Sequence, residues 1–111
     1  MEPHKIEIIR NLNRIIAPHF GVEPWDITRK DGTIPATDAR RVAYHILYYY
    51  FEWRLHQIRE AYHRNSVSGI HDLIRSANDL KEVNSEFAAK LHKCWDEIIQ
   101  KCPDYNVILV D

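Results

Sequence analysis

Apolar residues recur at steps of three and four along most of the chain, which is the spacing of one face of an α-helix. The first series predicts a helix that ends at Phe20, with Gly21 as its C-terminal cap. Later series predict a short helix from about residue 24, with Trp25 and Ile27 turned inward, and further helices at about 37–53, 54–63, 65–80 and 85–101. The positions that define these series are Ile6, Ile9, Leu12, Ile16, Phe20, Trp25, Ile27, Val42, Ala43, Ile46, Leu47, Tyr50, Phe51, Leu55, Ile58, Ala61, Tyr62, Ile70, Leu73, Ile74, Ala77, Leu80, Phe87, Leu91, Cys94, Trp95 and Ile98.

Turn-forming residues separate these series. The stretch "RKDGTIP" predicts a loop, because Asp-Gly is a strong turn dipeptide and proline restricts the residue before it. Thr37 is a suitable N-cap for the following helix, and Asp38 would lie in its first turn, where the helix dipole favours an acid. Residues 42–51 carry the widest apolar stripe, so this helix is expected to be the central buried one. The segment "YNVILV" near the C-terminus has strand character and is expected to pack as an extended tail or to pair with another chain.

The pattern predicts an all-α fold, a compact bundle of five to six helices. We expect residues 1–84 to form the main domain, with the helix and tail of residues 85–111 packed on it. No apolar run reaches the roughly 18 residues that span a bilayer, which predicts no membrane partner and a cytoplasmic location. On a helix, Cys94 and Cys102 would be too far apart for a disulfide, so both are expected to be reduced thiols.

The sequence carries no strong signal for catalysis or for a cofactor. It contains no phosphate-binding glycine loop, no Cys-x-x-Cys and no His-Glu-x-x-His. His92 and Cys94 are two residues apart and would face different sides of a helix, which argues against a catalytic dyad or a metal pair. Neither an enzyme nor a metal protein is therefore expected.

Charge is distributed unevenly although the net charge is only −1. Residues 29–64 carry seven Lys or Arg against four Asp or Glu, whereas residues 65–111 carry five against eight. This asymmetry predicts a basic middle and an acidic C-terminal third. The overall balance argues against a strongly basic nucleic-acid binder.

Two of the predicted helices, at 54–63 and 65–80, are joined by a tight turn, and the second begins with small polar residues. This is the outline of a helix-turn-helix, in which the first residues of the second helix read base edges in the major groove. In that outline Asn65, Ser66, Ser68 and Arg75 are candidate base contacts. Asparagine suits adenine in particular.

The order of motifs is more specific than the outline. The stretches "IAPHFGVEPWDIT", "ARRVAYHIL" and "IREAYHRNSVSGIHDLIRSANDL" resemble, over about residues 6–80, the DNA-binding domain of the bacterial replication initiator DnaA. The resemblance implies a helical bundle around a helix-turn-helix, also similar to the Trp repressor. It further implies double-stranded DNA as the partner, read by a small stand-alone protein of the kind found in phages or mobile elements.

The resemblance also suggests which residues would hold phosphates. Lys30 matches a position in the family's basic loop, and Arg40 matches the arginine of its "ARQ" motif. With neighbouring cations, the expected phosphate contacts are Arg29, Lys30, Arg40, Arg41 and Arg64. Asp31 and Asp38 stand where the family commonly carries basic residues, and in the ungapped register only Ser68 survives from the family's "RDHST" signature. Altered or weakened recognition is therefore expected.

A second function remains open on the same fold. The loss of loop cations, the overall acidity and the extra C-terminal helix also fit a protein-interaction module that has lost DNA binding. Homodimerisation through residues 85–110 is the form that this alternative would take. A dimer could also bind DNA by avidity, so the two functions are compatible.

Overall fold

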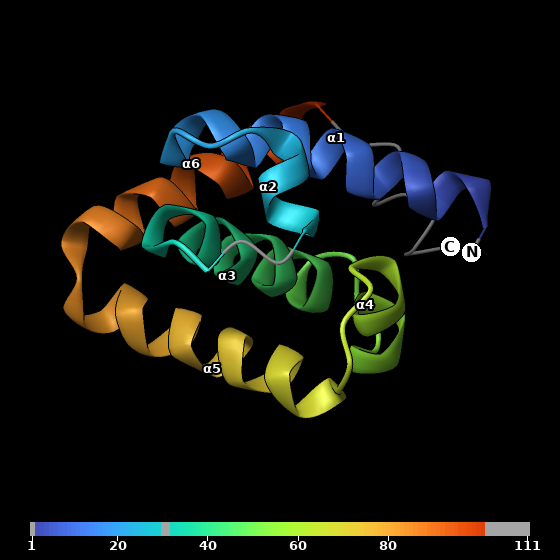
Figure 1. The fold of residues 1–111 in the computed structure, drawn as a ribbon. Helices are drawn as coiled ribbons and strands as arrows, with labels where there is room; N and C mark the ends of the chain where they lie inside the picture. The colour runs from blue at the N-terminus through green and yellow to red at the C-terminus, as the bar shows by residue number, and fades with distance from the viewer. Residues whose placement is uncertain (1, 30–31, 102–111) are drawn as a thin grey trace.

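The computed structural model describes residues 2–29 and 32–101, and in these residues it contains six α-helices and no strand (Figure 1). The all-α fold predicted from the apolar pattern is confirmed. The helices are α1 (Pro3–Phe20), α2 (Pro24–Thr28), α3 (Ile34–Tyr49), α4 (Leu55–Ala61), α5 (Val67–Val83) and α6 (Ser85–Lys101). None of them is both long and apolar enough to cross a lipid bilayer. The predicted tail lies outside the described residues.

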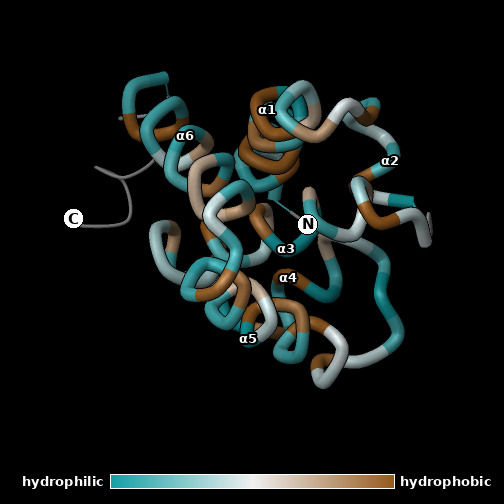
Figure 2. Tube along the Cα trace, turned by 90° about the vertical axis from the view of Figure 1, so that its left-hand side faces the viewer, coloured by the Kyte–Doolittle hydropathy of each residue, from teal (hydrophilic) through white to brown (hydrophobic). Residues whose placement is uncertain are grey.

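Helix α3 occupies the centre of the bundle, as its wide apolar stripe predicts. It lies between α1 and α6 on one side and α5 on the other, and α2 and α4 also contact it (Figure 1). Every residue from 42 to 47 is buried. In Figure 2 the hydrophobic stretches of α1 and α3 lie toward the middle, while the outer turns of α5 and α6 are hydrophilic. The remaining helices therefore take their positions from one buried helix.

The end of α1 follows the predicted glycine cap. Gly21 adopts the left-handed conformation (φ 67°), which costs glycine nothing. The backbone N–H of Val22 then donates to Ala17 O at 3.2 Å, which closes the last turn of the helix. This cap turns the chain back, so that α2 lies against α1.

Three local predictions are wrong. Helix α3 ends at Tyr49, before the predicted end at about residue 53, and Glu52 just beyond it has a positive φ of 57° that no α-helix accommodates. Helix α3 begins at Ile34, before the predicted N-cap Thr37, because Pro35 fits the first turn of a helix and needs no hydrogen-bond acceptor there. The hydroxyl of Thr37 instead donates to Thr33 O at 2.9 Å from inside the helix. Trp25 was expected to turn inward with Ile27, but it is 58% exposed, whereas Ile27 is fully buried. A five-residue helix has room for one inward anchor, and Ile27 takes that position.

A buried polar network holds α6 against the centre of the bundle. His45 of α3 is 6% exposed and lies between Trp95 of α6 and Asn78 of α5. The indole Nε1 of Trp95 donates to His45 Nδ1 at 3.2 Å, so the other ring nitrogen, 3.1 Å from Asn78 Oδ1, carries the proton. A doubly protonated ring could not accept from Trp95. The fold therefore requires neutral His45, and the pKa of this side chain is lowered to about 4, mainly by burial.

Helix α6 is also joined to α1. His19 Nε2 lies 2.6 Å from Glu97 Oε1, and Lys101 contacts the second oxygen of the same carboxylate at 3.3 Å. Desolvation raises the pKa of Glu97, but the hydrogen bonds from His19 and Lys101 outweigh it and leave the pKa below its usual value. The apolar side of α6, including Phe87, Leu91, Cys94 and Ile98, is buried against the rest of the chain. Residues 85–101 thus complete the same core as the preceding helices.

The thiol of Cys94 belongs to the core. Cys94 is buried and is not in a disulfide, and its burial raises the pKa of the thiol to about 12. It is therefore an unreactive packing residue at neutral pH. Cys102 lies outside the described residues.

The neutral His45 predicts acid sensitivity well above the pH at which carboxylates titrate. Below pH 6.5 the unfolded chain protonates this histidine while the folded one does not, so stability falls as the pH drops toward 4. We expect a loss of about 2 kcal/mol between pH 7.5 and pH 5, measured by urea unfolding. His45→Gln offers the same acceptor to Trp95 and the same donor to Asn78 without titrating. An equally steep pH dependence in that variant would contradict the assignment.

Candidate nucleic-acid interface

The two helices of the predicted helix-turn-helix are α4 and α5, joined by residues 62–66. Ser66 caps α5, its hydroxyl accepting from the backbone N–H of Gly69 at 3.4 Å. His63 in the turn has a positive φ of 54°, a left-handed conformation that costs a non-glycine residue about 1–2 kcal/mol. Tyr62 compensates by anchoring the turn. It is fully buried, and its hydroxyl donates to Asn13 Oδ1 of α1 at 2.8 Å.

The predicted base-contact residues lie together at the N-terminal end and on the outer face of α5. Asn65, Ser66 and Ser68 are exposed, and the Ser66 and Ser68 hydroxyls lie 3.1 Å apart. Arg75 is exposed two turns further along, where its guanidinium pairs with Asp72 at 3.4 Å. The face therefore carries polar groups of both signs and is not purely cationic.

Arg40 has a structural position that its sequence context does not reveal. It is 5% exposed, and its guanidinium donates to the backbone oxygens of Asp26, Ile27 and Arg29 at 2.8–3.0 Å. These are carbonyls at the C-terminal end of α2, which no α-helix satisfies internally. The burial and the bonds of Arg40 explain its presence without DNA, so we assign it to the fold and leave it out of the proposed contacts.

Arg64 converges on the same carbonyls from the turn of the helix-turn-helix. Its Nη2 donates to Arg29 O at 3.1 Å and to Thr28 O at 3.2 Å, and its Nε donates to the hydroxyl of Tyr44 at 3.2 Å. Arg64 is half-buried, so part of it faces solvent. It joins the loop after α2 to the start of α5.

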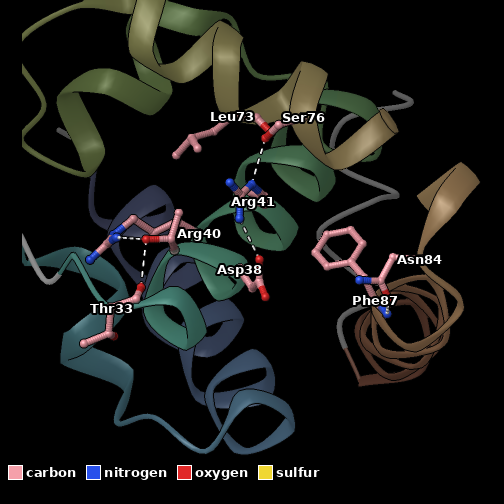
Figure 3. A network of polar contacts seen from close by, with 9 residues as sticks. Thr33, Asp38, Arg40, Arg41, Leu73, Ser76, Asn84 and Phe87 are labelled. Carbon is pink, nitrogen blue, oxygen red and sulfur yellow. Dashed lines mark hydrogen bonds and ion pairs between the residues drawn. The ribbon is translucent and has the colours of Figure 1, made fainter. Parts of the chain in front are cut away.

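Arg41 points away from Arg40, toward α5 (Figure 3). Its Nη1 contacts Asp38 Oδ1 at 2.6 Å, and its Nε donates to Ser76 Oγ at 2.8 Å. Asp38, which stands where the resembling family carries a cation, therefore neutralises Arg41 within the chain. A phosphate would have to displace both partners.

The loop after α2 supplies one exposed cation in the described residues. Arg29 is exposed and pairs with Asp26 at 2.7 Å, a contact that leaves most of its side chain in solvent. Lys30 lies outside the described residues. Of the four expected phosphate contacts among the described residues, Arg64 lies in the turn before α5 and Arg29 is joined to it through its backbone oxygen. Arg40 is buried against the same oxygen, and Arg41 points to another side of α3.

Two further cations were missed as site residues. Arg54, the N-cap residue of α4, is exposed, and Arg59 on α4 is half-buried; neither forms an ion pair with another described residue. In a helix-turn-helix the first helix crosses the phosphate backbone, so this is where such cations are useful. The position of α4 before the turn was the signal that could have identified them.

The part of the chain that the structure describes contains no cluster of residues suited to bind a metal ion. No three residues among its histidines, cysteines and carboxylates are grouped as metal ligands would be. The pair of His19 and Glu97 joins two helices and borders a surface hollow between α1 and α6. No hydroxyl or thiol nucleophile lines that hollow.

Comparisons of the chain with protein-family models, with curated proteins and with solved structures gave no match. The similarity to DnaA therefore depends on the motifs quoted above.

The contrast between Arg40 and Arg41 predicts very different costs for neighbouring substitutions. Arg40→Ala removes the donors of three backbone carbonyls and should lower the free energy of unfolding by about 2–4 kcal/mol. Arg41→Ala removes a partly exposed ion pair and should cost about 0.5–1 kcal/mol. Urea unfolding of both variants measures the difference. Equal costs would show that the carbonyl cap does not stabilise the fold.

Proposed function

We propose that the protein binds double-stranded DNA through α4 and the N-terminal end of α5. The observation that carries the proposal is the exposed polar set Asn65, Ser66 and Ser68, presented on a capped helix after a short helix and a tight turn. In this mode Asn65 and Ser68 face base edges, with Arg75 further along the groove. The hydroxyl oxygen of Ser66 accepts the capping hydrogen bond from Gly69, so Ser66 also positions its neighbours.

The cations that support this mode are those with solvent-facing guanidinium groups near α4 and the turn. They are Arg29, Arg54, Arg59 and Arg64, with Lys30 as a further candidate from the loop. Asp26 and Glu60 offset part of this charge. Because Asp72 lies beside Arg75, the outer face of α5 gains little general attraction for phosphates. The proposal is therefore of a binder with modest affinity and a small number of phosphate contacts.

A titration against duplex DNA at two salt concentrations tests the proposal. Three phosphate contacts give a slope of about −2.7 in log affinity against log salt, or a loss of ~20-fold between 50 and 150 mM. Arg54→Ala should lower affinity at 50 mM and make the slope shallower by about one unit, whereas Lys93→Ala, on the exposed side of α6, should change neither. If no duplex binds at 50 mM salt, DNA binding is excluded.

A protein-interaction surface is the second candidate, and it is favoured by a different observation. Trp25 is 58% exposed and Ile6 is 45% exposed, and both border one hollow of about 310 Å³ between α1 and α2. Exposed tryptophan is enriched in interface hot spots. Homodimerisation through residues 85–101 is less favoured, because the apolar side of α6 is buried within the chain. We therefore place this candidate surface at Trp25.

Self-association through this surface can be measured directly. Light scattering at about 0.5 mM protein should give a mass above the monomer, and Trp25→Gln should return it to the monomer, because a desolvated tryptophan contributes at least 2 kcal/mol. Ile99→Gln, which alters an exposed apolar residue of α6, is the matched control. A monomeric wild type would count against a homodimer.

A further inference from the structure

A small hollow lies where the helix-turn-helix meets α3. Its volume is about 240 Å³, and its polar walls are formed by Arg40 and Tyr44 of α3 and by Arg64, Asn65 and Ser66 of the turn. Gly69 and two apolar side chains complete the lining. No carboxylate is among these residues, and Arg40 and Arg64 are the charged side chains that border the hollow.

The hydroxyl proton of Tyr44 is a hydrogen-bond donor that the fold leaves unused. The residue has no exposed surface, and its hydroxyl oxygen accepts from Arg64 Nε at 3.2 Å. Among the described residues no acceptor is found for the hydroxyl proton. Burial raises the pKa of Tyr44 above its usual value, so the proton is retained at neutral pH. A buried donor without an acceptor calls for an additional partner.

Several other donors surround this proton. Arg64 uses Nε and Nη2 in the hydrogen bonds described above, whereas Nη1 makes no hydrogen bond to a described residue. The Ser66 and Ser68 hydroxyls share one hydrogen bond between them. The hollow also adjoins the start of α5, a helix of 17 residues whose first N–H groups carry partial positive charge. All of these groups favour an oxyanion.

We propose that this hollow is a binding site for a single phosphate group, with the Tyr44 hydroxyl and the Arg64 guanidinium as its principal donors. The inference deepens the proposed function, since a backbone phosphate held there would fix the start of α5 relative to the duplex. The site itself requires only a phosphate oxygen, which a phosphodiester or a free phosphate can supply equally. The two sources differ in what else they contact, and the experiment separates them.

The first experiment titrates inorganic phosphate into the full-length protein, with chloride at matched ionic strength as the reference. The backbone amide signals of Asn65 and Gly69 should shift saturably, with a dissociation constant on the order of 1–10 mM. Tyr44→Phe should weaken this binding about tenfold, the usual effect of losing one hydrogen bond to a charged group. Tyr48→Phe, which removes an exposed hydroxyl from the same helix, should bind as the wild type does. Shifts that stay linear, or that are equal in Tyr44→Phe, would overturn the site.

A second variant keeps the test decisive if Tyr44→Phe does not fold. Ser66→Gly removes a hydroxyl from the hollow and costs only a few tenths of a kcal/mol at an N-cap. It should weaken phosphate binding at least threefold while thermal unfolding shows a folded protein. If a folded Ser66→Gly variant binds phosphate as tightly as the wild type does, the Ser66 hydroxyl is not part of the phosphate site.

The source of the phosphate is separated with a duplex that has no terminal phosphates. If the backbone is the source, this duplex shifts the same amides and binds Tyr44→Phe less tightly than Tyr48→Phe. If inorganic phosphate binds and the duplex does not, the phosphate site stands and the DNA proposal fails. If the duplex binds Tyr44→Phe and Tyr48→Phe equally, and phosphate causes no saturable shift, the DNA proposal stands and the phosphate site is wrong.

Discussion

The arrangement of this bundle depends on how the end of a five-residue helix is satisfied. The last carbonyls of helix α2, like those of every α-helix, have no donor within the helix, and two guanidinium groups bond them instead. Arg40 approaches from the central helix and Arg64 from the turn of the helix-turn-helix, and both donate to Ile27 O and Arg29 O. One cluster of backbone oxygens thus joins α2, α3 and the start of α5. Since the donors are buried or half-buried, this cluster is the point from which the candidate interface takes its geometry.

The sequence supported prediction of the helices because their apolar periodicity is strong. The start of α5 and the span of α6 agree with the pattern within a residue or two, and the glycine cap of α1 lies where the sequence predicts it. The start of α3 was missed because Thr37 competes as an N-cap with an equally permissible Pro35, and local propensity does not decide between them. Trp25 was placed inward on hydrophobicity alone, although a short helix can bury only one side.

The candidate site was less predictable, because a cation in the sequence does not reveal its partner. Arg40 and Arg41 are adjacent and chemically identical. Arg40 nevertheless caps α2 inside the protein, whereas Arg41 pairs with Asp38 one turn earlier in α3. Arg54 and Arg59 were not predicted as phosphate contacts, because their usefulness comes from the position of α4 beside the turn. Tyr44 could not be recognised at all, since an apolar stripe gives no information on whether a tyrosine hydroxyl finds an acceptor. These distinctions depend on contacts between residues far apart in the chain.

The chain of hydrogen bonds from Tyr62 through Asn13 to Thr28 has a consequence for how the chain can be divided. Asn13 is buried in the middle of α1, accepts from the turn before α5 and donates to the end of α2 at 3.0 Å. The turn is therefore held by a residue about fifty positions earlier in the sequence. A fragment that contained only α4 and α5 would keep the residues of the turn but lose the support that offsets its left-handed histidine. The smallest fragment able to present the turn and the start of α5 in their native conformation therefore begins within α1.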